Sequence, residues 1–182
     1  MRRVLVIAIV AALLAATGSC AGETETTGAP AAGKEAEVYV QVLRRYLGTP
    51  AENSFPDRSF ATVYLLDQAF PDAGDPSGKH ERGTPLTPET QRYLTTALTP
   101  MTHLAFIADR TTVIETKNGC AQVRDGGILI TLGPAIGDEH EVQVAVYGFV
   151  ACLGATWLTY VVRNDPGTGW RVTGTTGPTA IS

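Results

Sequence analysis

Apolar and polar positions alternate along most of the second half of the chain, and this alternation predicts β-strands there. Residues 127–133 and 141–152 both alternate, and the polar stretch 134–140 between them predicts a hairpin loop. Residues 156–163 and 169–174 follow the same pattern on either side of a turn. Further strands are predicted over three shorter segments, 60–68, 104–109 and 112–116.

Two other segments have apolar residues at helical spacing. Residues 34–47 place large apolar side chains on one stripe, with acidic residues near the start and arginines near the end, where the helix dipole favours each charge. Thr87 predicts an N-cap and Pro88 a first helical position, so a second helix is expected to run to Leu98. A long polar loop, 69–85, precedes it.

One or two helices beside this many strands predict an α+β fold, in which the helices pack on a curved antiparallel sheet. Cystatin-like and NTF2-like folds fit this order of elements, an analogy at the level of the fold that implies no activity. Residues 34–182 have the size of a single domain and contain no internal repeat and no second linker.

Cys120 and Cys152 are predicted to form a disulfide. If the hairpin is centred on Ile136, Ile130 faces Val142, and the continued ladder sets the two cysteines opposite each other. In an exported protein an even pair of cysteines is expected to be oxidised. The same register places five apolar side chains on one face of the sheet: Ile128, Ile130, Val142, Val144 and Val146.

Export is expected because the first 20 residues have the order of a secretory signal. Arg2 and Arg3 form a basic start, 4–16 is an uncharged apolar run, and small residues lead to Cys20. The run is 13 residues long, whereas a helix needs about 20 apolar residues to cross a bilayer. A signal peptide is therefore favoured over a permanent membrane span.

The sequence Thr17-Gly18-Ser19-Cys20 resembles the lipobox of bacterial lipoprotein precursors, in which lipid is joined to the cysteine and the peptide is cut just before it. The resemblance covers only these first 20 residues and implies a lipid on Cys20 that anchors the domain. Residues 21–33 lack large apolar side chains and are expected to be a flexible tether. The alternative is ordinary signal peptidase cleavage after Ala21, which removes Cys20 and leaves a secreted protein.

Charge and motifs narrow the function classes. Two of the 14 basic residues belong to the signal, so 12 remain against 18 acidic residues, a net charge near −6. This balance argues against a nucleic-acid partner. The chain contains no G-x-S-x-G, Walker, H-E-x-x-H or C-x-x-C motif, so the common hydrolase, nucleotide, zincin and dithiol sites lack their usual residues and no cofactor is expected.

Two polar groups are candidates for chemistry. Asp138 and His140 offer oxygen and nitrogen ligands for a divalent cation, although we expect a solvated loop and no metal there. His80, in the long loop with Asp75, is a candidate general base in a loop that otherwise only connects elements. No catalytic residue is predicted from either group. His103 is expected to be structural.

Aromatic residues form the third candidate. Trp157, Tyr160 and Trp170 lie on adjacent predicted strands and are candidates for lining a ligand pocket between sheet and helix, with core packing as the alternative. Together these features predict an exported, lipid-anchored binding or accessory module without catalytic activity, at the outer face of the cytoplasmic membrane. Its ligand or protein partner is unknown. The alternative is a small extracytoplasmic enzyme with a pocket in the concave sheet.

Overall fold

The computed structural model describes residues 33–53, 55, 59–78 and 82–182. The expected signal peptide, Cys20 and almost all of the tether lie outside these ranges, as do Lys79, His80 and Glu81. Within the described ranges, no helix combines the length and apolar character that crossing a membrane requires.

The helices are α1 (Lys34–Gly48), α2 (Pro50–Asn53) and α3 (Pro88–Leu98), with 3-10 turns η1 (Arg110–Thr112) and η2 (Arg124–Gly126). The strands are β1 (Thr62–Leu66), β2 (Gln68–Ala69), β3 (Thr84–Pro85), β4 (His103–Ile107), β5 (Ile114–Lys117), β6 (Cys120–Val123), β7 (Ile128–Leu132), β8 (Ile136–Gly137), β9 (Glu141–Ala151), β10 (Gly154–Asp165) and β11 (Gly169–Ile181). The predicted cap of α3 is confirmed, because the Thr87 hydroxyl oxygen accepts a hydrogen bond from the Thr90 N–H at 3.1 Å.

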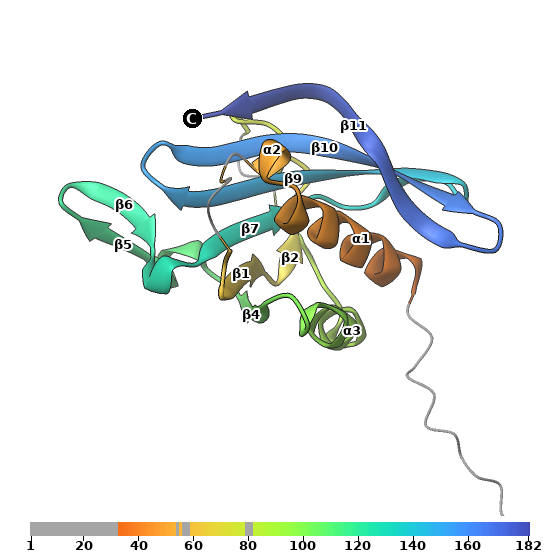
Figure 1. The fold of residues 1–182 in the computed structure, drawn as a ribbon, viewed down its shortest axis with the longest axis horizontal. Coiled ribbons are helices and arrows are strands. Elements are labelled where there is room, and N and C mark those ends of the chain that lie inside the picture. The colour runs from red at the N-terminus through yellow and green to blue at the C-terminus, as the bar shows by residue number, and fades with distance from the viewer. Residues whose placement is uncertain (1–32, 54, 56–58, 79–81) are drawn as a thin grey trace, which may run out of the picture.

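A curved sheet forms the body of the molecule, with strand order β11-β10-β9-β7-β1-β4 (Figure 1). Its long strands, β9, β10 and β11, form an antiparallel meander. The predicted α+β class and curved sheet are confirmed. The sheet is not antiparallel throughout, however, because β1 pairs in parallel with both of its neighbours, β4 and β7.

The register of the predicted hairpin differs in the structure. Ile130 pairs with Gly148, six residues further along β9 than expected, because β8 pairs with β9 inside the connection and lengthens it. β6 meets β9 in another register, with Gln122 opposite Ala151. Continued backward, the β7 ladder would set residue 127 opposite Ala151, so an offset of five residues separates the two registers. The turn η2 between β6 and β7 takes up this offset.

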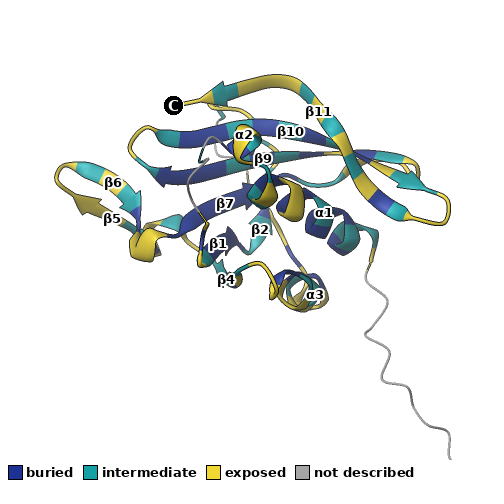
Figure 2. Ribbon diagram, in the orientation of Figure 1, coloured by how far each residue is buried: buried dark blue, intermediate teal, exposed yellow. Residues whose placement is uncertain are grey.

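The main core lies between the sheet and α1 (Figure 2). Alternate residues of β7, β9 and β10 point toward the helix, as the strand period of two requires. The predicted grouping of apolar side chains on one face is confirmed, since all five are fully buried or nearly so: Ile128, Ile130, Val142, Val144 and Val146. α3 packs beside α1 and covers β4.

Buried polar groups join α1 to the sheet. The Tyr46 and Thr156 hydroxyl oxygens lie 2.5 Å apart in the core, and burial raises the pKa of Tyr46 to about 12. The Tyr160 hydroxyl donates to the Glu52 carboxylate at 2.7 Å, and Arg45 pairs with the same carboxylate. Gly148 faces Tyr46, and a Cβ there would lie 2.7 Å from Tyr46 Cζ and closer still to the hydroxyl oxygen. Glycine is therefore required at position 148 for α1 to approach β9.

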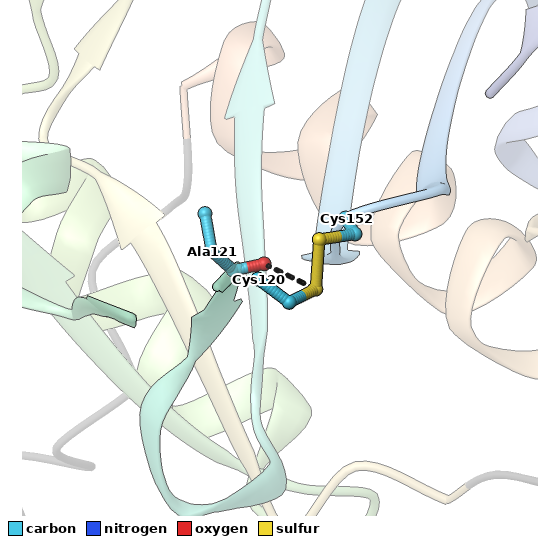
Figure 3. Close-up of a disulfide and its surroundings, with 3 residues drawn as sticks. All are labelled: Cys120, Ala121 and Cys152. Carbon is cyan, nitrogen blue, oxygen red and sulfur yellow. Dashed lines mark hydrogen bonds between the residues drawn. A yellow bond between two sulfur atoms is a disulfide. The ribbon is translucent and has the colours of Figure 1, made fainter. Parts of the chain in front are cut away.

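The predicted disulfide between Cys120 and Cys152 is confirmed, with their Cα atoms 5.4 Å apart (Figure 3). It joins the β5–β6 hairpin to the turn between β9 and β10. This hairpin projects from one end of the sheet (Figure 1), and one residue pair of β6 is in register with β9. The disulfide is thus a covalent attachment of the hairpin to the turn after β9, in addition to the buried cluster that Val123 shares with Phe149.

Candidate functional site

Among the described residues, no α-helix covers the face of the sheet opposite α1, and two irregular segments cover parts of this face. At one end the β5–β6 hairpin buries Val113 and Val123 against Leu129 and Phe149. At the other end residues 70–78, here named the 70–78 loop, fold over the sheet. Much of this face is therefore enclosed without being part of the main core.

The 70–78 loop is held by short-range hydrogen bonds. The Phe70 N–H donates to the Leu132 carbonyl at 2.8 Å, which fixes the start of the loop to the end of β7. Successive turns follow, in which the Asp75 N–H donates to the Asp72 carbonyl at 3.0 Å. Gly74 lies against the sheet, since a Cβ on it would be 3.0 Å from the Ala145 Cβ.

A pocket of about 380 Å³ lies between this loop and the sheet. Its volume falls at the lower end of the range for small-molecule sites, about 300–1,000 Å³. Its walls combine aromatic, aliphatic, acidic and basic groups, contributed by Leu66, Phe70, Asp72, Ala73, Asp75, Pro76, Gly78, Ala108, Asp109, Arg110, Thr131, Tyr147 and Trp157.

The topology explains why these residues meet. β1, β4 and β7 run parallel, so their carboxyl ends lie at one edge, and each chain segment must leave the sheet there. Leu66 ends β1, residues 108–110 follow β4, and Thr131 lies one residue before the end of β7. The antiparallel strands β9 and β10 complete the floor.

That floor is an aromatic pair. Tyr147 and Trp157 are directly opposite each other on β9 and β10, with ring centroids 5.1 Å apart and planes at 34°. The Arg110 guanidinium lies 5.6 Å from the centroid of the Tyr147 ring, and its Nη2 donates to the Tyr147 hydroxyl oxygen at 3.3 Å. Both rings are half-buried. They therefore present flat apolar surface beside a fixed cation.

Thr131 supplies a hydroxyl to the same floor. It is paired with Tyr147 across β7 and β9, and its residue is only 8% exposed. No hydrogen bond joins its hydroxyl to another described residue, yet the hydroxyl oxygen is not among the fully buried atoms, so it keeps access to solvent. Since Thr131 lines the pocket, its hydroxyl is available to water or to a molecule that occupies the pocket.

Two exposed carboxylates stand at the rim. One oxygen of Asp75 accepts hydrogen bonds from the Ser77 hydroxyl and N–H, both at 2.8 Å, and these bonds lower the pKa of Asp75. One oxygen of Asp109 accepts from the Thr111 N–H at 2.8 Å, and hydrogen bonds from Thr111 lower the pKa of Asp109. Both groups are therefore ionised at neutral pH, each with its second oxygen still available as an acceptor.

The aromatic residues predicted from the sequence do not share one pocket. Trp157 lies on the open face and lines the pocket, whereas Tyr160 and Trp170 lie on the helix-covered face. Residues 157 and 160 differ by an odd number along one strand, so their side chains point to opposite faces. Tyr160 is fully buried and Trp170 nearly so, and the Lys34 ammonium lies 5.4 Å from the Trp170 ring centroid. These two residues pack in the core.

Of the polar candidates, Asp138 and His140 do not line the pocket. One Asp138 oxygen accepts hydrogen bonds from the His140 and Glu141 N–H groups, so this carboxylate closes its own turn. In the part of the chain that the structure describes, no three His, Cys, Asp or Glu residues are grouped as a metal site. His103 is exposed at the start of β4. His80 lies outside the described residues, while its neighbour in sequence Asp75 is at the pocket rim.

Sequence reasoning did not identify Thr131, Asp109 or Arg110 as site residues. A sequence signal for Thr131 exists, because the two-residue period of a strand places it on the face opposite the core residue Ile130. The same period places Tyr147 on the face opposite Val146, so it assigns Thr131 and Tyr147 to one face of the sheet. Asp109 and Arg110 carry no such signal, because their place depends on the parallel pairing of β1 with β4.

The fold and the site together define an α+β domain with a ligand-sized pocket on the open face of its sheet. No protein-family model matches the chain, and neither a curated protein nor a solved structure does.

Proposed function

We propose that this chain is an exported, lipid-anchored binding module whose ligand site is the pocket over Tyr147 and Trp157. The single observation that carries the proposal is the pocket itself, which combines the Tyr147–Trp157 pair with polar groups, among them the accessible hydroxyl of Thr131. A few polar groups placed among aromatic and aliphatic walls are typical of small-molecule sites.

Binding without catalysis is the function that the charges favour. A general acid at neutral pH needs a raised pKa, whereas the pKa values of Asp75 and Asp109 are lowered by hydrogen bonds. Neither His103 nor His140 lines the pocket. The pocket groups are thus suited to accept and donate hydrogen bonds rather than to transfer a proton to a leaving group.

A fragment screen tests the binding site. Trp170→Phe leaves Trp157 as the one tryptophan, so its indole N–H gives a single, assigned signal in ¹H–¹⁵N spectra. We expect members of a library of neutral, cationic and anionic fragments to shift this signal together with the Thr131 and Arg110 amides, because all three groups line one pocket.

Tyr147→Ala is the variant that disrupts the pocket, because it removes one of the two aromatic rings of the floor at a half-buried position. It is expected to weaken those fragments about tenfold or more, because aromatic contacts contribute substantially to buried area in such sites. If no fragment shifts the pocket signals, or if Tyr147→Ala leaves their affinities unchanged, the pocket is not the binding site.

The anchor is proposed from residues 1–20 and has its own test. When the full chain is expressed in a bacterium that processes lipoproteins, the mature protein is expected to begin at a diacylated Cys20 and to fractionate with membranes. Two chains of acyl lipid give stable attachment. Cys20→Ser is expected to abolish the lipid mass and the membrane fraction. A mature protein that begins at Gly22 would contradict the anchor and leave a secreted module.

A further inference from the structure

We propose that the pocket binds a neutral, hydroxyl-rich ligand with an apolar face, a sugar unit or a disaccharide. This inference rests on the proposed binding function and adds the chemical class of the ligand. It follows from the aromatic floor, the Thr131 hydroxyl that is open to the pocket, and the placement of charges of both signs around them.

The polar groups of the pocket include both donors and acceptors. Asp75 and Asp109 each keep one carboxylate oxygen without a partner among the described residues, and these oxygens only accept. The Arg110 guanidinium only donates, and the Thr131 hydroxyl does both. A sugar hydroxyl donates one hydrogen bond and accepts others, so a ring carrying several hydroxyls offers the donors and acceptors that these groups require.

The other simple ligand classes each leave a conflict. An anion would face the carboxylates of Asp75 and Asp109. A cation would compete with Arg110, whose guanidinium already lies over the Tyr147 ring. A purely apolar ligand would cover the Thr131 hydroxyl without pairing it, which is unfavourable for a buried polar group.

The floor also fits the shape of a sugar ring. The C–H groups on one face of a pyranose form a flat apolar surface, and the half-buried Trp157 ring offers apolar surface of a matching kind. Arg110 lies over the neighbouring Tyr147 ring, where it can donate to a hydroxyl at the edge of the sugar. The volume of about 380 Å³ is small for a drug-sized ligand and limits the fit to a short saccharide.

Titration calorimetry and ¹H–¹⁵N spectra of the mature protein test the proposal with glucose, galactose, mannose, N-acetylglucosamine, maltose and cellobiose. Choline and glucuronate serve as the cationic and anionic probes. We expect at least one neutral sugar to bind at the pocket and to shift the Trp157 indole signal, and choline and glucuronate to bind at least tenfold more weakly.

Thr131→Val and Thr131→Ser separate the hydroxyl from the packing. Thr131→Val keeps the shape and removes the hydroxyl, so it is expected to lower sugar affinity about tenfold or more, while Thr131→Ser retains most of the affinity. Thr175→Val, the same change at an exposed position of β11, is the control and is expected to leave binding unchanged.

The outcomes distinguish the two proposals. If fragments shift the pocket signals but every neutral sugar fails, or if choline or glucuronate binds there more tightly, the sugar proposal is overturned and the binding module stands. Equal affinity of Thr131→Val and the wild type also overturns it. If a bound disaccharide is cleaved, the ligand class holds and the non-catalytic function is wrong.

Discussion

Gly148→Ala is expected to lower the free energy of unfolding by about 3 kcal/mol, at the upper end of the cost of overpacking a core. A Cβ at this position would lie 2.7 Å from Tyr46 Cζ and closer to the hydroxyl oxygen, and both Tyr46 and its partner Thr156 are fully buried. Helix α1 would have to move away from β9. Denaturant titration followed by circular dichroism measures the change.

Gly174→Ala is the matched control, because a Cβ there meets no atom within 4 Å. It is expected to change stability by only a few tenths of a kcal/mol, as surface substitutions usually do. A mutant cycle with Tyr46→Phe tests the cause, since removal of the hydroxyl relieves part of the overlap. An equal cost of Gly148→Ala in both backgrounds would show that the overlap with the Tyr46 hydroxyl is not responsible.

The double variant Cys120→Ser/Cys152→Ser is expected to lose about 3 to 4 kcal/mol of unfolding free energy. The disulfide spans 32 residues, and the chain-entropy model gives this value for a loop of that length. Little packing is lost, because Cys152 is exposed and Cys120 only half-buried. The destabilisation therefore reports mainly the freedom that the unfolded chain regains.

Reduction of the wild-type protein supplies the comparison. Denaturation midpoints are measured with and without reductant, and a thiol titration confirms that the disulfide has opened. We expect the reduced wild type to match the double variant, and the double variant to be insensitive to reductant. An unchanged midpoint after complete reduction would contradict this estimate.

Local signals were enough to predict several elements. Thr87 and Pro88 fix the start of α3, because capping and proline geometry depend only on neighbouring residues. The two-residue period sorted the side chains of β7 and β9 into faces even though the register was wrong, since a shift by an even number of residues keeps each side chain on its face. The disulfide was predicted correctly, although the turn η2 lies between Cys120 and β7 and gives β6 and β7 different registers against β9.

Long-range pairing accounts for what was missed. β1 lies between β4 and β7 in the sheet, yet Tyr64 pairs with Ala105 and Leu129, 41 and 65 residues away. No local pattern marks such partners. The pocket depends on this arrangement, because Leu66, Asp109 and Arg110 reach it only through the shared carboxyl ends of these strands. Trp157 was named from its residue type, and its position in the strand separates it from Tyr160.

The two faces of β9 serve different parts of the molecule, the main core on one side and the pocket on the other. Val142, Val144 and Val146 are fully buried under α1, while Tyr147 on the other face lines the pocket. Residues that hold the main core and a residue that lines the pocket therefore alternate along one strand. Substitutions at the pocket positions of β9 change the pocket while the packing under α1 stays intact, so the two faces of this strand can vary independently.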